Sequence, residues 1–344
     1  MRSLFFGLIF LAVVAVAIVA WLWQDMQREL HSPMPVAATT DYSVERGMTL
    51  RTIATDLHQR GWISQPYYLL LAARQQDLGG RIKAGEYVIE PGTTPQDFLA
   101  VIVSGRVKQY SLTIVEGWNY RELLAAVRTH PKLEQTLAAG LERDPAALAE
   151  TLALSHPHPE GLFYPDTYNF PAGTTDVQFL QRAHRTLLAV LEQEWDGRKD
   201  DLPYESAYEA LIMASIIEKE TAVAAERGEI AGVFYRRLKT GMRLQTDPTV
   251  IYAIGENYDG NLRRADLQFE SPYNTYVSDG LPPTPIAMAG RASIHAALHP
   301  QPGETLYFVS RGDGTHYFSR NLQEHNRAVA KYQLGRKGIE LPNE

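Results

Sequence analysis

The segment from Leu4 to Trp23 contains no charged side chain and reads as one apolar run. At about 1.5 Å of rise per residue, a helix of this length covers roughly 30 Å, the thickness of the hydrocarbon core of a bilayer. Trp21 and Trp23 stand at its far end, where aromatic side chains anchor a helix at the membrane interface. The segment therefore predicts one transmembrane anchor within residues 1–25, and the rest of the chain must fold on one side of a membrane.

The charges around this segment predict its orientation. Arg2 is the only charge before the span, and a long polar region follows it, so we expect a cytoplasmic N-terminus and an extracytoplasmic body. A cleaved signal peptide is the alternative, because Ala15-Val16-Ala17 imitates a cleavage site. The apolar run continues past that site and exceeds the ~7–15 residues of a secretory core, which favours an uncleaved anchor.

Composition and motif searches exclude several classes of function. The net charge of -7 argues against a nucleic-acid binder, and the absence of cysteine excludes disulfides, thiol nucleophiles and cysteine-ligated zinc. The chain has no G-x-S-x-G, P-loop or G-x-G-x-x-G motif. His295 and His299 have the spacing of a zinc helix but lack the glutamate of H-E-x-x-H, so we expect neither a metal nor a cofactor.

Periodicity and turn signals predict an α+β fold after the anchor. Residues 26–40, with Pro33 and Pro35, are interpreted as a linker. A small α/β module follows over 41–106, then a connector over 107–155 and a larger α+β body over 156–344. The expected helices begin at residues 50, 66, 95, 120, 131, 145, 176, 206 and 322, and the expected strands cover 86–89, 109–115, 306–310 and 316–319. The helix that begins at residue 206 is expected to run to about residue 225 and to continue to residue 239. The region after this helix is expected to be rich in loops.

The stretch Ala214-Ser-Ile-Ile-Glu-Lys-Glu-Thr221 holds the first candidate for catalysis. On one continuous helix, Glu218 shares a face with small and apolar residues, namely Leu211, Ala214, Ala222 and Ala225. Burial disfavours the ionised form of a carboxyl group, and general-acid attack on a glycosidic oxygen requires the protonated form. The alternative is a structural carboxylate that pairs with Arg227 or Arg243.

Two polar clusters downstream are suited to a sugar ligand. Gln245, Thr246 and Asp247 precede Pro248, and a second cluster of Asn274, Thr275 and Tyr276 lies near the rigid segment 280–283. Sugar hydroxyls need paired donors and acceptors, and sugar ring faces pack on aromatic side chains. The alternative for Asn274 and Thr275 is that they satisfy the backbone of a turn.

Five motifs together resemble the endolytic murein transglycosylases, the MltG or YceG-like family. They are EGLFYPDTY (160–168), ASIIEKET (214–221), LQTDPTVIYA (244–253), YNTY (273–276) and GLPP (280–283). The similarity spans nearly the whole chain. One departure is Thr284, which stands after GLPP where the family often has glycine.

This resemblance implies a location, an activity and partners. Members are single-pass proteins of the inner membrane, with a cytoplasmic N-terminus and a periplasmic catalytic domain, and they cut peptidoglycan glycan strands internally. Residues 41–106 then correspond to a LysM-like peptidoglycan-binding subdomain, with Val44 to Leu50 leading into its helix. The catalytic acid maps onto Glu218, Glu160 joins the two polar clusters as a substrate-binding candidate, and a peptidoglycan synthase is a plausible partner.

The implied chemistry needs one carboxyl group. Glu218 protonates the oxygen between N-acetylmuramic acid and N-acetylglucosamine, and its carboxylate then takes the proton of the muramic C6 hydroxyl, which closes a 1,6-anhydro ring. A hydrolytic muramidase is an alternative, with Asp247, Glu160 or Asp166 as the second carboxylate. A membrane-tethered glycan-binding scaffold without catalysis is another, and in it Glu218 is structural.

Overall fold

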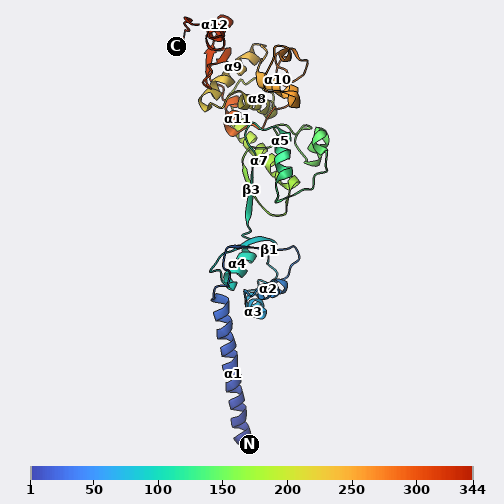
Figure 1. Cartoon of the computed structure of the whole chain (residues 1–344), viewed down its shortest axis with the longest axis vertical. Helices are drawn as coiled ribbons and strands as arrows, with labels where there is room; N and C mark the ends of the chain where they lie inside the picture. The colour runs from blue at the N-terminus through green and yellow to red at the C-terminus, as the bar shows by residue number, and fades with distance from the viewer. Residues whose placement is uncertain (1, 343–344) are drawn as a thin grey trace. The chain divides into compact units, whose positions relative to one another are not determined.

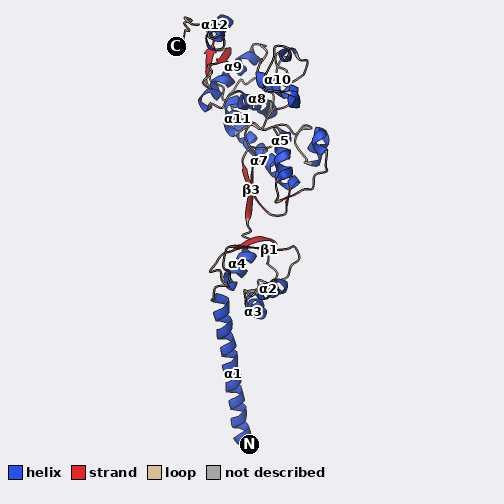
Figure 2. Cartoon of the chain, viewed as in Figure 1, coloured by secondary structure: helices blue, strands red, loops and turns tan. Residues whose placement is uncertain are grey.

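The computed structural model describes the backbone of residues 2–342 and the side chains of residues 5–342. The chain forms two compact units of mixed helix and strand. Unit 1 comprises Met1–Tyr110 and Asn169–Thr174, and unit 2 comprises Ser111–Tyr168 and Thr175–Glu344. Figure 2 shows that helices dominate both units and that the strands are short.

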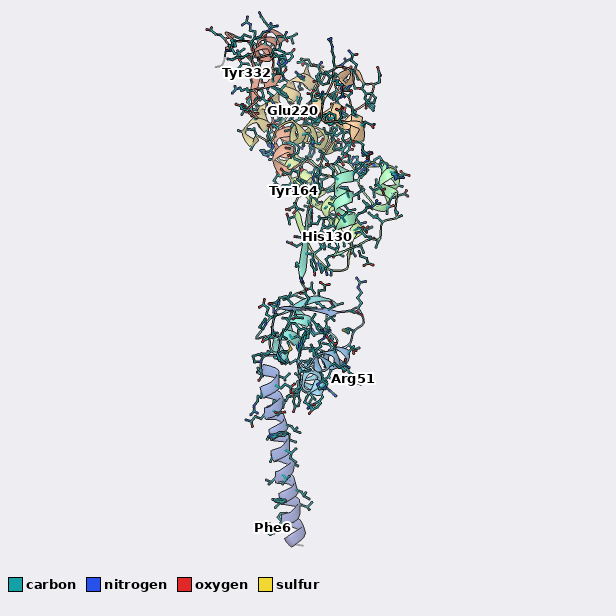
Figure 3. The ribbon with its side chains drawn as sticks, viewed as in Figure 1. Phe6, Arg51, His130, Tyr164, Glu220 and Tyr332 are labelled. Atoms are coloured by element: carbon teal, nitrogen blue, oxygen red, sulfur yellow. The ribbon has the colours of Figure 1, made fainter. Side chains whose placement is uncertain are left out.

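The first helix, α1 (Arg2–His31), is unbroken in Figure 1. Its apolar side chains as far as Trp23 are exposed, as Phe6 shows in Figure 3, whereas Met26 and Leu30 are buried in the core of unit 1. The structure thus differs from the linker expected over 26–40, because the helix continues to His31, and Met34 and Val36 are also buried. Among residues 2–342, α1 is the one helix long and apolar enough to cross a membrane. Residue 1 and the side chain of Arg2, on which the predicted orientation rests, lie outside the described atoms.

Unit 1 packs three helices against an antiparallel pair of strands. The strands are β1 (Thr40–Val44) and β2 (Gly85–Ile89), and the helices are α2 (Leu50–Gln59), α3 (Pro66–Gln75) and α4 (Pro95–Ser104). Tyr42 and Tyr87 lie opposite each other in the register and point into the core. Thr49 and Thr94 cap α2 and α4 through their side chains. The helices predicted for this module are confirmed, and β1 was not predicted.

Unit 2 is mainly helical. Its α-helices are α5 (Tyr120–Thr129), α6 (Pro145–Thr151), α7 (Asp176–Asp196), α8 (Ala207–Glu220), α9 (Arg227–Lys239), α10 (Asp247–Ile254), α11 (Arg291–Leu298) and α12 (Leu322–Tyr332). Two hairpin strands, β7 (Tyr307–Ser310) and β8 (His316–Ser319), pair in antiparallel fashion. The remaining short strands are β3 (Gln109–Thr113), β4 (Leu133–Glu134), β5 (Thr167–Pro171) and β6 (Thr174–Thr175), which pair as β3–β5 and β4–β6. Of these, β3, β5 and β6 each contain residues of both units. The helix expected over 131–139 is wrong, because this segment forms a turn and β4.

Helix α8 forms the centre of unit 2. Every residue from Ala210 to Ile217 is buried, in a core shared with α7, α9 and α11. The helix ends at Glu220, because Thr221 is extended with a φ of -142°. The continuous helix expected from 206 to 239 is therefore wrong: α8, a 3-10 turn at Ala224–Glu226 and α9 replace it. As a consequence, Ala222 and Ala225 do not extend the face on which Glu218 lies.

Candidate functional site

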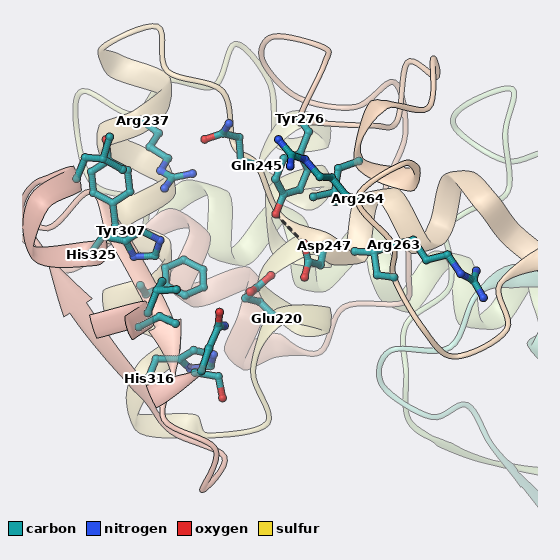
Figure 4. Close-up of a pocket in the computed structure, with 18 residues that line it drawn as sticks. Glu220, Arg237, Gln245, Asp247, Arg263, Arg264, Tyr276, Tyr307, His316 and His325 are labelled. Atoms are coloured by element: carbon teal, nitrogen blue, oxygen red, sulfur yellow. Dashed lines mark hydrogen bonds between the residues drawn. The ribbon is translucent and has the colours of Figure 1, made fainter. Parts of the chain in front are cut away.

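A cavity of about 600 Å³ opens at the C-terminal end of α8. Figure 3 shows Glu220 in this part of unit 2, and Figure 4 shows the side chains that surround it. The wall is formed by α9, α10, the segment around 262–267, the β7–β8 hairpin and α12. Its polar lining includes Glu220, Arg237, Gln245, Asp247, Tyr276 and His316.

Glu220 is half-buried and lines the cavity. Its carboxylate accepts a hydrogen bond of 2.5 Å from the hydroxyl of Thr246. Burial raises the pKa of the Glu220 carboxyl, and the neighbouring Asp247 charge raises it further, against the opposing effects of the Thr246 hydrogen bond and of nearby cations. The position of Glu220 at the C-terminus of α8, where helix carbonyls concentrate negative potential, also disfavours the ionised form. This group can therefore carry a proton at higher pH than an exposed glutamate.

Asp247 faces the cavity from the first residue of α10. Its Oδ1 accepts a hydrogen bond of 2.6 Å from the Tyr276 hydroxyl, shown as a dashed line in Figure 4. The preceding Gln245 has a φ of 48°, in the left-handed region that side chains rarely adopt, and its N–H donates to the carbonyl of Thr275 at 3.1 Å. This strained turn presents Gln245 and Asp247 to the cavity. Three predicted substrate-binding residues thus line it: Gln245, Asp247 and Tyr276.

The other members of the two polar clusters are buried beneath this surface. The Asn274 amide donates to the backbone carbonyl of Phe269 at 2.8 Å, and the Asn274 side-chain oxygen accepts from the N–H of Tyr276 at 2.9 Å. Thr275 accepts from the N–H of Thr246 at 3.1 Å. Asn274 and Thr275 therefore hold the loops that carry the cavity wall, which is the alternative considered for them, whereas Thr246 contacts Glu220 directly.

Glu218 lies in a different environment from Glu220. Its carboxylate accepts from the N–H of Gly290 at 2.9 Å and lies 3.7 Å from the guanidinium of Arg227, and it is not among the residues that line the cavity. The structural ion pair with Arg227, considered above as the alternative, is present. Two residues apart on a helix are separated by about 200°, so Glu218 and Glu220 face opposite ways. Glu220 was not predicted as a site residue from the sequence, although it lies in the same ASIIEKET motif as Glu218.

Glu160 is fully buried and does not line the cavity. Its carboxylate accepts from the N–H of Tyr120 at 3.0 Å, the N–H of Gly161 at 3.2 Å and the hydroxyl of Tyr252 at 2.9 Å. Burial raises the pKa of Glu160 to about 7, against the lowering effect of these donors. Glu160 therefore joins α5 to α10 inside unit 2, and Asp166, the other candidate from that motif, is exposed outside the cavity.

The two histidines with zinc-helix spacing lie beside Glu194, and ligand atoms of all three are within 4.8 Å of one another. Both nitrogens of His299 already face carbonyls, of His295 at 3.1 Å and of Gly197 at 2.9 Å. The Arg291 guanidinium donates to Glu194 at 3.0 Å and places a positive charge where a cation would bind. These contacts describe a hydrogen-bonded ion network, and we assign no metal to it.

Comparison with known proteins agrees with the motifs. A sequence model described as the YceG-like family matches residues 42–331. The chain is 32% identical over 311 residues to an endolytic murein transglycosylase of Bacillus subtilis, which covers 86% of this chain and 85% of the relative. It is 26% identical to an endolytic murein transglycosylase of Streptococcus pneumoniae, over 94% of this chain and 64% of that protein. A solved yceG-like protein of Listeria monocytogenes is similar at a TM-score of 0.54 and 30% identity, covering 84% of this chain and 99% of that one.

Proposed function

The chain belongs to the YceG-like family, and on this premise we propose that it is a peptidoglycan lytic transglycosylase that cleaves glycan strands internally. The names of its relatives support the substrate and the reaction class. The observation that carries the proposal is a half-buried carboxyl group with a raised pKa, Glu220, at the wall of a cavity lined with sugar-compatible groups. The reaction acts on the bond between N-acetylmuramic acid and N-acetylglucosamine.

We assign the role of acid and base to Glu220 and a structural role to Glu218. Glu220 meets the two requirements for a general acid, a raised pKa and access to a bound substrate. Glu218 accepts from the backbone N–H of Gly290, pairs with Arg227 and does not line the cavity, so its contacts are those of a structural carboxylate. This proposal moves the acid and base from Glu218, which was predicted from its helical face and from the family motif, to its neighbour two residues along.

In the proposed reaction, the Glu220 proton goes to the bridging oxygen as the bond to the muramic C1 breaks. The N-acetylglucosamine part leaves as an alcohol, and positive charge develops at C1. The Glu220 carboxylate, to which the Thr246 hydroxyl donates, then takes the proton of the muramic C6 hydroxyl as that oxygen bonds to C1. The attack is intramolecular, so its effective concentration is high without a second catalytic carboxylate.

Hydrolysis is the second candidate, and the position of Asp247 favours it. Asp247 lines the same cavity as Glu220 and is oriented by Tyr276, as a base or nucleophile for a muramidase would be. Glu160 and Asp166 do not line the cavity, so they do not support that role. The two reactions differ in their products: 1,6-anhydro-muramic ends arise without water, and reducing ends arise from hydrolysis.

We further propose that α1 anchors the protein in the inner membrane with its N-terminus in the cytoplasm and unit 2 in the periplasm. The exposed apolar surface of α1 and the polar body that follows support this arrangement. Residues 41–106 are proposed as a LysM-like module that binds the glycan. A synthase is proposed as a partner whose nascent strands the enzyme trims or terminates.

The decisive experiment is mass spectrometry of purified peptidoglycan digested by the wild type, by Glu220→Gln and by Glu218→Gln. We expect anhydro-muramic ends from the wild type and a loss of about 10²–10⁴-fold in rate for Glu220→Gln, the usual contribution of a general acid. Glu218→Gln is the matched control, and we expect it to retain cleavage. Wild-type-like cleavage by Glu220→Gln would instead support the non-catalytic role, and reducing muramic ends would support hydrolysis.

A further inference from the structure

On α1, the proposed span changes within one turn to residues that are packed into the core of unit 1. Trp23 is 51% exposed, and Met26, less than one turn later, is only 3% exposed. Between them, Asp25 is the first charged residue after the span. Since each residue advances a helix by about 1.5 Å, the packed part of unit 1 begins within about 5 Å of the last aromatic residue of the span. The globular part of unit 1, which begins at Met26, therefore lies directly beside the interface that Trp21 and Trp23 define.

Helix α3 is fixed to this part of α1. The Tyr68 hydroxyl donates to Asp25 at 2.7 Å, and the backbone N–H groups of Ser64 and Gln65 donate to Glu29 at 2.6 and 3.1 Å. Glu29 thereby supplies acceptors for the start of α3, where Gln65 makes no side-chain cap. Figure 1 shows α3 beside the end of α1, on the side of unit 1 that faces the span.

The outer face of α3 is apolar with one cation. Tyr67 is 46% exposed and Leu71 is 45% exposed, and Arg74 continues the same face with the spacing i, i+4, i+7. The inner face, with Tyr68, Leu69, Ala72 and Ala73, is buried in the core of unit 1. A tyrosine, a leucine and an arginine on one exposed stripe are typical of a surface that rests in a lipid interface.

We propose that the Tyr67–Leu71–Arg74 face of α3 lies in the headgroup region of the bilayer that α1 spans. The proposal rests on the proposed membrane anchor, and its own basis is the attachment of α3 to Asp25 and Glu29. The two apolar side chains enter the outer edge of the acyl region, and the guanidinium pairs with lipid phosphate. Unit 1 is then held at two places, the span and α3, so its orientation to the membrane is fixed instead of swivelling about one helix.

The chain contains no cysteine, so a single introduced cysteine carries an environment-sensitive fluorophore at one chosen place. The full-length protein is placed in lipid nanodiscs and labelled in the separate variants Leu71→Cys, Ser43→Cys and Val14→Cys. Ser43 is exposed on β1, on the side of unit 1 away from the span in Figure 1, and is the matched control. Val14 lies within the apolar run and reports on the anchor itself.

We expect the probe at position 71 to emit at shorter wavelength than the probe at position 43, and to be quenched most strongly by lipids with a nitroxide at the headgroup. The probe at position 14 should be quenched most strongly by a nitroxide deep in the acyl chain. Solvent-like emission from the probe at position 71, together with a membrane signal from the probe at position 14, overturns the α3 contact and leaves the anchor intact. Cross-linking of position 71 to another protein in native membranes, with the same solvent-like emission in nanodiscs, also overturns the lipid contact. Solvent-like emission at both positions overturns the anchor.

Discussion

Glu160 is fully buried and Glu220 is half-buried, and both carboxyl groups have raised pKa values, yet their surroundings suit them to different tasks. Glu160 accepts from three donors inside a closed core, so its proton has no route to a substrate. Glu220 accepts a hydrogen bond from the hydroxyl of Thr246 and lines the cavity. At the residue scale, access to solvent-filled space, more than the raised pKa, separates the proposed catalytic acid from a structural one.

The charge of Asp247 provides a test of the proposed role of Glu220. Repulsion from Asp247 raises the Glu220 pKa in addition to burial, so Asp247→Asn should lower that pKa. An acid catalyst must be protonated, so the activity of Asp247→Asn should fall at a lower pH than that of the wild type. The measurement is the pH dependence of glycan cleavage, with Asp279→Asn, an exposed partner of Arg243, as the control that leaves the profile in place. An unchanged alkaline limb in Asp247→Asn would contradict the assignment.

The raised pKa of Glu160 predicts a pH-dependent stability. The folded protein holds the Glu160 proton more tightly than the unfolded chain, so this stabilisation is complete below about pH 4.5 and is lost as the pH rises through about 7. Glu160→Gln keeps an acceptor but cannot ionise. At 1.36 kcal/mol per pKa unit, the wild type should lose up to about 3 kcal/mol relative to the variant between pH 4.5 and pH 8. Thermal unfolding at both pH values measures this, and parallel curves for the two proteins would show that Glu160 does not titrate in this range.

At the element scale, the sequence predicted helices best where a cap and an apolar period coincide. Thr49, Thr94 and Asn119 each cap a helix where one was expected. The end of α8 was missed because the residues after Thr221 are good helix formers. The break between α8 and α9 is set by tertiary packing, which local sequence signals do not reveal. Only part of the candidate site was predicted, for the same reason. The motifs contain the residues of the site, but the choice between Glu218 and Glu220 depends on where α8 ends, and the sequence did not show this.

Gly161 shows how one element constrains another in unit 2. Its φ is 71°, and an added Cβ would lie 2.4 Å from the Cβ of Pro285. Gly161→Ala therefore combines a left-handed backbone penalty with overpacking, and we expect a loss of about 3 kcal/mol of stability. Gly140→Ala is the control, because its φ is 87° but no atom lies within 4 Å, so it should cost only the backbone part, about 1 kcal/mol. Equal melting temperatures for the two variants would contradict the role of the Pro285 contact.

At the scale of the whole molecule, α1 has an exposed apolar part and a part packed into the core of unit 1. The apolar composition of Leu4 to Trp23 made the first part predictable, whereas the continuation of the helix into the core was not, because Pro33 and Pro35 suggested an irregular linker. The prolines come after His31, where α1 has already ended, so they do not interrupt it. Burial of Met26 and Leu30 is a tertiary contact, and local sequence signals do not reveal it.

Two deletions separate the roles of α1. Removing residues 2–23 takes away the span and leaves Met26 and Leu30, so we expect a soluble protein in which unit 1 keeps its stability. Removing residues 2–31 also takes away these two side chains and the contacts of Asp25 and Glu29 with α3. Burial of two such side chains contributes about 4 kcal/mol, and for a domain of this size the melting temperature should fall by more than about 10 °C. Thermal unfolding of the two proteins measures the difference. If both melted alike, residues 24–31 of α1 would be dispensable for the stability of unit 1 and would serve only as a spacer.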